Sequence, residues 1–98
     1  MIATWKYDTE WAQEKTEFIK GTPGFMLIKW NQFHHCQAWI GEYGGMFDLI
    51  KSYKTIVGLV DKQNQFVYEL GHWSKTTTQQ IRKIYRECYS RYEFVPYR

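Results

Sequence analysis

The segment "TIVGLVDKQNQFVYEL", residues 55–70, carries the clearest structural signal in the chain. Two runs rich in β-branched and aromatic residues, 55–60 and 66–70, flank the polar connection 61–65, which is the pattern of a β-hairpin. Neither face of the first run is plainly polar, so we expect both faces to be buried and the hairpin to be central in its sheet. Gly58, inside the first run, predicts a bulge or the close approach of a ring from the next layer.

A helix is predicted directly after the hairpin, in "WSKTTTQQIRKIYRECY", residues 73–89. The hydroxyls of Ser74, Thr76 and Thr77 stand where the strand must give way to the helix, and each can accept a hydrogen bond from an amide of the first turn. Both Thr76 and Thr77 precede a glutamine by three residues, which is the spacing of a capping box. Apolar residues then recur at intervals of three and four, at Ile81, Ile84, Tyr85, Cys88 and Tyr92. This spacing predicts an amphipathic helix laid across an antiparallel sheet.

A second helix is predicted near the N-terminus, in "DTEWAQEKTEFIKGTPG", residues 8–24. Asp8 and Thr9 are suited to cap its start, and Lys20 followed by Gly21 is typical of a helix end. Its apolar face is sparse and consists of Trp11, Ala12, Phe18 and Ile19. We therefore expect this helix to be lightly anchored.

Two further strands are predicted between this helix and the hairpin. Residues 25–30, "FMLIKW", follow a turn and form a short apolar run, which favours a buried strand. Residues 33–45, "FHHCQAWIGEYGG", continue as a second strand that the glycines at its end interrupt. The predicted fold is therefore α+β, a single domain over residues 1–98. It has an antiparallel sheet of about four strands, a C-terminal amphipathic helix packed on the sheet and an N-terminal helix.

Composition bounds the class of protein. A chain of 98 residues is one small domain, and its 6 Phe, 5 Trp and 8 Tyr residues must supply much of its core. The same abundance also allows a surplus of rings on the surface for a partner. The net charge of +3 excludes a carboxylate-covered mimic of DNA, yet it is too weak to make the whole surface a nucleic-acid footprint.

The expected compartment is the cytoplasm. No run of eighteen apolar residues suggests a membrane span, and the first residues, "MIATWKYDTEW", carry charge where a signal peptide needs an apolar run. Without an export signal, Cys36 and Cys88 are expected to be reduced, buried or half-buried, and not linked to each other.

No catalytic site, metal site or cofactor is expected. The run His34, His35, Cys36 offers three metal ligands, but on a strand only His34 and Cys36 would share a face. A Cys36–His72 nucleophilic pair would lack a residue to orient its base, and the carboxylates are scattered singly. The predicted helix entrance, with Lys75 close by, could hold an anion, but it lacks the glycines of a P-loop.

Residues 52–88 resemble a family of small bacteriophage-encoded proteins of unknown function. The resemblance rests on "SYKTIVGLV", residues 52–60, followed after the hairpin by "YELGHWSKTTTQQI", residues 68–81. In that family a Ser-Tyr-x-Thr strand, a second strand ending in an aromatic-Ser pair, and a Thr-Thr helix entrance occur in this order. The family favours a His shortly after the threonines, where this chain has residues 79–81, "QQI", so no role of that His carries over. The resemblance implies a phage or prophage origin, with the host bacterial cytoplasm as the compartment.

Two functions remain open after these exclusions. In the first, the chain is a phage-type binding protein that inhibits or modulates a host protein or ribonucleoprotein by occupying a surface, as anti-CRISPR proteins do to defence nucleases. In the second, it is an accessory protein that binds nucleic acid directly through the basic face of its C-terminal helix. Neither function involves a membrane, and the oligomeric state is left open. The residues expected to contact the partner are Lys75, Arg82, Lys83, Arg86 and Tyr89.

Overall fold

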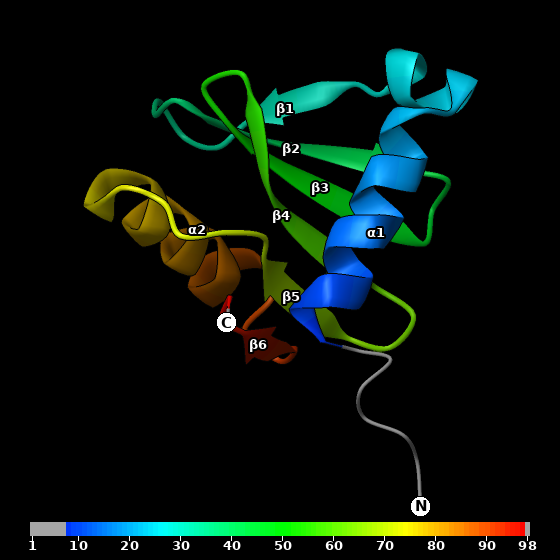
Figure 1. The fold of residues 1–98 in the computed structure, drawn as a ribbon. Helices are drawn as coiled ribbons and strands as arrows, with labels where there is room; N and C mark the ends of the chain where they lie inside the picture. Colours follow the sequence, from blue (N-terminus) through cyan, green and yellow to red (C-terminus); the bar gives the residue numbers. More distant parts are fainter. Residues whose placement is uncertain (1–7, 98) are drawn as a thin grey trace, which may run out of the picture.

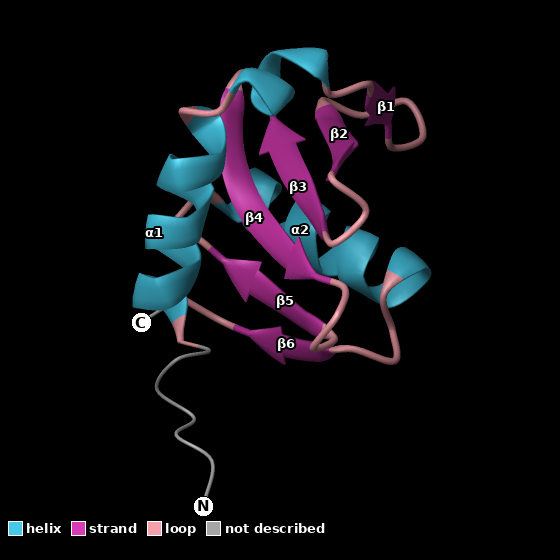
Figure 2. Ribbon diagram, turned by 90° about the vertical axis from the view of Figure 1, so that its right-hand side faces the viewer, coloured by secondary structure: helices cyan, strands magenta, loops and turns pink. Residues whose placement is uncertain are grey.

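The computed structural model describes residues 8–97 and has three layers, shown in Figures 1 and 2. Helix α1, Thr9–Lys20, lies on one face of a six-stranded sheet, and helix α2, Lys75–Cys88, lies on the other. The predicted α+β class is confirmed, together with both predicted helices. Neither helix has the length and apolar character that crossing a bilayer requires.

The sheet follows the order of the chain. Its strands are β1 Trp30–Gln32, β2 Ala38–Tyr43, β3 Phe47–Ser52, β4 Thr55–Asp61, β5 Phe66–Glu69 and β6 Glu93–Val95. The first five form an antiparallel meander, and β6 returns after α2 to pair with β5 in parallel. The sheet has six strands, whereas about four were predicted. The prediction did not separate β3 from the hairpin, and β6, with three residues, was too short to be recognised.

The central hairpin is confirmed as β4 and β5. Both faces of β4 are buried, since Leu59 and Val60 point to opposite sides and each is 0% exposed. The irregularity predicted from Gly58 is present as well. The β3–β4 register shifts between Ile50 and Lys51, and a Cβ atom on Gly58 would lie 3.2 Å from the Ile50 Cβ atom.

Two hydrophobic cores lie on the two faces of the sheet. The core on the α1 side consists of Ala12, Ile19, Leu49, Leu59, Tyr68 and Leu70. The core on the α2 side consists of Phe33, Ala38, Ile50, Val57, Val60, Val67, Ile81, Ile84 and Tyr89. Successive residues of β3, β4 and β5 alternate between the two cores, as the pleat of a strand requires.

Helix α1 has the predicted boundaries but a different buried face. The Asp8 side chain accepts a hydrogen bond from the Trp11 amide at 2.9 Å, and Gly21 ends the helix. The buried residues are Thr9, Ala12, Thr16 and Ile19. The placement of Phe18 on the buried face was wrong, because its side chain is 66% exposed. Threonines therefore take part in the packing where large apolar residues were expected.

The strand predicted over residues 25–30 was wrong. Pro23–Leu27 forms the 3-10 helix η2, with its proline in the first turn, and Met26 and Leu27 are 82% and 81% exposed. Only Trp30 of the predicted strand belongs to β1. The apolar run was thus misread as core, because an exposed apolar segment has the same composition as a buried one.

The strand predicted over residues 33–45 is shorter than expected. Residues 33–37 form a turn in which His34 takes the left-handed conformation, with φ +52°. Strand β2 runs through Gly41 and ends before Gly44 and Gly45, whose φ values are +63° and +75°. The expectation that His34 and Cys36 share the face of a strand was therefore wrong.

Helix α2 starts earlier than the predicted capping boxes. Its N-cap is Ser74, whose side chain accepts from the Thr77 amide at 3.3 Å, so Thr76 and Thr77 lie inside the helix and the prediction that they cap it was wrong. The residue after the helix, Tyr89, has φ −134°, and it turns into the core in place of Cys88, which is exposed.

The cap at Ser74 gives a stability prediction. The Ser74→Ala variant should lower the free energy of unfolding by about 1 kcal/mol, because an amide of the first turn loses its acceptor. The Thr76→Ala variant is the matched control, since Thr76 is exposed and caps nothing. Urea unfolding of both variants measures the difference, and equal losses of stability would contradict Ser74 as the cap.

Candidate functional site

The solvent side of α2 is basic. Lys75, Arg82, Lys83 and Arg86 are all exposed, and we call these four residues the basic face. Glu87 is the one acidic residue in this helix. The opposite side of α2 buries Thr77, Ile81 and Ile84 against the sheet, so the orientation of the basic face is fixed by core packing.

The four cations of the basic face differ in their surroundings. Arg82 is partly engaged, since its Nε atom lies 3.8 Å from Glu69 Oε2 and its guanidinium lies 5.1 Å from the centre of the Phe94 ring. Within residues 8–97, no carboxylate forms an ion pair with Lys75, Lys83 or Arg86. Three cations of the basic face are therefore available to an external anion.

Tyr89, the fifth residue predicted to contact a partner, is not part of this surface. Its side chain is 8% exposed, and its hydroxyl donates a hydrogen bond of 2.6 Å to Asp48 Oδ2. Burial and this hydrogen bond raise the pKa of Tyr89 far above its ordinary value, so the phenol stays protonated. The prediction that Tyr89 is exposed beside the basic face was wrong. The helix ends at Cys88, and Tyr89 has a non-helical backbone conformation in which its side chain is buried.

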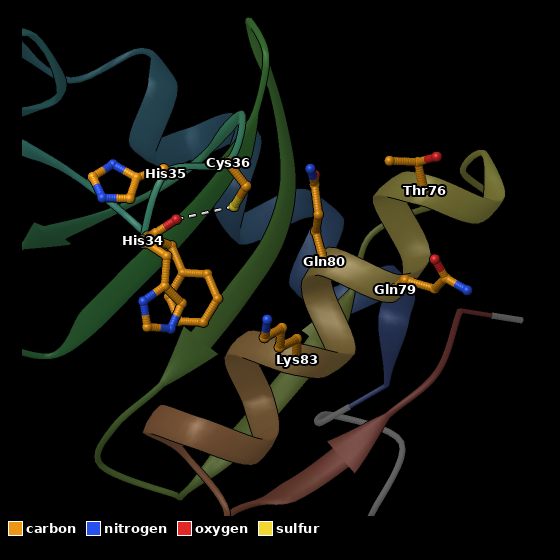
Figure 3. Close-up of a pocket in the computed structure, with 8 residues that line it drawn as sticks. His34, His35, Cys36, Thr76, Gln79, Gln80 and Lys83 are labelled. Carbon is orange, nitrogen blue, oxygen red and sulfur yellow. Dashed lines mark hydrogen bonds between the residues drawn. The ribbon is translucent and has the colours of Figure 1, made fainter.

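A pocket of about 310 Å³ lies beside the basic face, between α2 and the turn at residues 33–37. It is lined by Phe33, His34, His35, Cys36, Thr76, Gln79, Gln80 and Lys83. Figure 3 shows His34 and Cys36 on the turn facing α2, with His35 directed away from the helix. Lys83 is the residue of the basic face that contributes to this pocket.

The histidines and the cysteine of this pocket are engaged separately. His34 Nε2 donates to Glu87 Oε1 at 2.7 Å, and the Cys36 thiol donates to the Phe33 carbonyl oxygen at 3.0 Å. Among the residues that the structure describes, no three His, Cys, Asp or Glu side chains gather as a metal site would require. The turn that holds the His-His-Cys run is instead tied to α2 through the His34–Glu87 pair.

A buried polar cluster joins β3 to α2. The Ser52 hydroxyl donates to Gln80 Oε1 at 3.0 Å, and it lies 3.2 Å from the Thr77 hydroxyl. Because Ser52 has one hydroxyl hydrogen, which goes to Gln80, Thr77 is the donor of the second bond. Ser52 ends β3 and Thr77 is in the first turn of α2, so this cluster fixes where the helix crosses the sheet.

Arg82, Lys83 and Arg86 were predicted on the solvent side of α2 and Lys75 at the helix entrance, and all four are exposed. The pocket and this cluster were not predicted. The order of the Ser-Tyr-x-Thr and Thr-Thr segments was the available signal for the contact between Ser52 and Thr77. Linear spacing does not reveal which strand end meets which helix turn. The neighbours Gln79 and Gln80 gave no sequence signal of their own.

Comparison with known proteins shows the family alone. Residues 9–93 match the model of a family described as "Family of unknown function (DUF8033)", and the chain belongs to that family. No curated protein and no solved structure matches the chain.

The cysteines give a prediction for this site. They are not linked, as expected, but Cys88 is exposed while Cys36 is half-buried and hydrogen-bonded. Alkylation of the native protein should therefore modify Cys88 before Cys36, and denaturation without reductant should expose both thiols. Partial burial of the thiol, together with the negative charges of Glu87 and Asp48, raises the pKa of Cys88. The modification of Cys88 at neutral pH should therefore be slower than that of an ordinary exposed thiol.

Intact mass and peptide mapping follow this reaction. Modification of Cys36 first in the native protein, or no uptake of the reagent after denaturation, would contradict this description of the two thiols.

Proposed function

We propose that this member of the DUF8033 family is a binding protein that uses the basic face of α2 to occupy an acidic surface of a host macromolecule, without catalysis. The observation that supports it is the set of three cations, Lys75, Lys83 and Arg86, without ion-pair partners among the described residues, on a helix whose other side is committed to the core. Cations that no internal carboxylate neutralises are free to pair with an external one.

The resemblance to phage-encoded proteins supports a host partner. On this proposal the chain acts in the cytoplasm of a bacterial host and occupies a protein or ribonucleoprotein, for example a defence nuclease as anti-CRISPR inhibitors do. A rigid scaffold with one oriented charged surface is sufficient for inhibition by occupation. Direct binding of nucleic acid by the same face is the alternative, and the weak net charge of +3 gives it less support.

The test is charge reversal at two exposed positions of α2. The variant Lys83→Glu with Arg86→Glu should keep the fold, because neither residue faces the core, and should lower affinity for the partner by at least about tenfold. Arg82 is left unchanged, since a glutamate there would face Glu69. The matched control is Lys29→Glu with Arg91→Glu, which changes the net charge equally at two exposed cations outside α2.

Capture from bacterial lysate, with and without nuclease treatment, measures the effect. We expect one dominant host protein or ribonucleoprotein to be retained by the wild type and by the control variant, and lost with the reversed α2 variant. Equal retention by a normally folded reversed variant would contradict the proposal. Capture that disappears after nuclease treatment would favour the nucleic-acid alternative.

A further inference from the structure

Helix α1 covers only part of its face of the sheet. Helix α1 packs with Leu49, Leu59 and Tyr68, which belong to β3, β4 and β5. On the same side, the neighbouring strands β1 and β2 carry two tryptophans, Trp30 and Trp39. Trp30 borders the α1-side core, whereas Trp39 is half-buried and packs against neither of the two described cores.

A lysine lies between the two indole rings. Lys51 is directly opposite Trp39 in the β2–β3 register, and its Nζ atom lies 4.2 Å from the centre of the Trp30 ring and 5.6 Å from that of Trp39. The room for this arrangement comes from Gly41, the cross-strand partner of Trp30. A Cβ atom on Gly41 would lie 2.8 Å from Trp30 Cε3. Two flat rings and one cation are thus held together on adjacent strands.

Trp30 and Lys51 also line a positively charged groove, and Trp39 lies next to its lining as the cross-strand neighbour of Lys51. A cavity of about 470 Å³ is lined chiefly by Lys20, Lys51, Lys54, Phe25, Trp30 and Ile56, and no carboxylate contributes to its lining. A second cavity of about 410 Å³ shares Lys20, Thr55 and Ile56 with the first and continues along α1 to Trp73. We call the two cavities together the α1 groove. One carboxylate, Glu17, lines the second cavity, and it pairs with Lys20 at 3.1 Å.

We propose that the α1 groove binds a single-stranded nucleic acid, with bases stacked on the rings around Trp30 and Trp39 and phosphates at Lys20, Lys51 and Lys54. Aromatic side chains beside a basic, elongated groove are the combination that binds single strands without sequence readout. The Lys51 ammonium lies over the Trp30 ring in the free protein, so a base that stacks on this ring would displace the ammonium toward the adjoining phosphate. A duplex would bind poorly, since its bases are already stacked on each other. An acidic peptide would use the lysines but not the flat faces of the rings.

The experiment uses the full chain and a labelled oligothymidylate of about twenty nucleotides. Affinity measured by fluorescence anisotropy should fall with salt, with a slope of log K against log salt near −2 for about three phosphate contacts. The Trp39→Ala variant should bind at least about fivefold more weakly, because one stacking platform is lost. Lys20→Glu with Lys54→Glu should weaken binding and flatten the salt dependence. Arg91→Glu, a charge reversal at an exposed position outside the α1 groove and the basic face, should bind as the wild type does. Lys83→Glu with Arg86→Glu tests whether the strand lies on α2 instead.

Other results would overturn the proposal. Wild-type affinity in folded Trp39→Ala, or loss of binding only in the α2 variant, would show that the groove does not hold the strand. If thymidine monophosphate binds as tightly as the oligonucleotide, the groove is a nucleotide site and not a strand site. If polyglutamate binds as tightly as the oligonucleotide and is unaffected by Trp39→Ala, the groove is a docking surface for acidic protein segments.

Discussion

The structure depends on the burial of its central strands from both sides. In β3, β4 and β5 consecutive residues such as Leu49 and Ile50, or Leu59 and Val60, are 0% exposed while they point to opposite faces. Such strands are stable in water only if a layer covers each face, so the meander requires one helix on either side. The antiparallel connections are short, and the two helices that flank the meander in the chain supply the two layers. The small domain is therefore a three-layer structure.

Both proposed surfaces follow from this arrangement. Helix α2 commits Thr77, Ile81 and Ile84 to one core, and the other half of the helix is left for exposed cations. Helix α1 has twelve residues and is about 18 Å long at 1.5 Å per residue. Its buried side packs with β3, β4 and β5, so the tryptophans of β1 and β2 lie at the border of the sheet surface that it covers. The sheet thus separates a basic helix face from a groove of rings and lysines. A partner on one side need not exclude a ligand on the other.

The elements with strong local signals were predictable from the sequence. The hairpin at residues 55–70, the end of α1 at Gly21 and the basic face of α2 each rest on periodicity or turn chemistry within one segment. The failures came from tertiary contacts. Residues 25–30 have a strand-like composition yet form an exposed 3-10 helix, and Tyr89 enters the core because α2 ends one residue earlier. The α1 groove could not be predicted from the sequence. Lys51 comes to lie beside Trp30 and Trp39 only through the register of β1, β2 and β3, which no local sequence signal specifies.

The most direct test of two separate surfaces is nuclear magnetic resonance of the ¹⁵N-labelled protein titrated with the oligothymidylate. We predict that the indole N–H signals of Trp30 and Trp39 and the amide signals of β1 and β2 shift, while those of residues 75–88 in α2 stay in place. The contrary result is a set of shifts concentrated at Lys83 and Arg86 with the two indole signals unmoved. That outcome would place the nucleic acid on the basic face of α2 and leave the α1 groove without its proposed ligand.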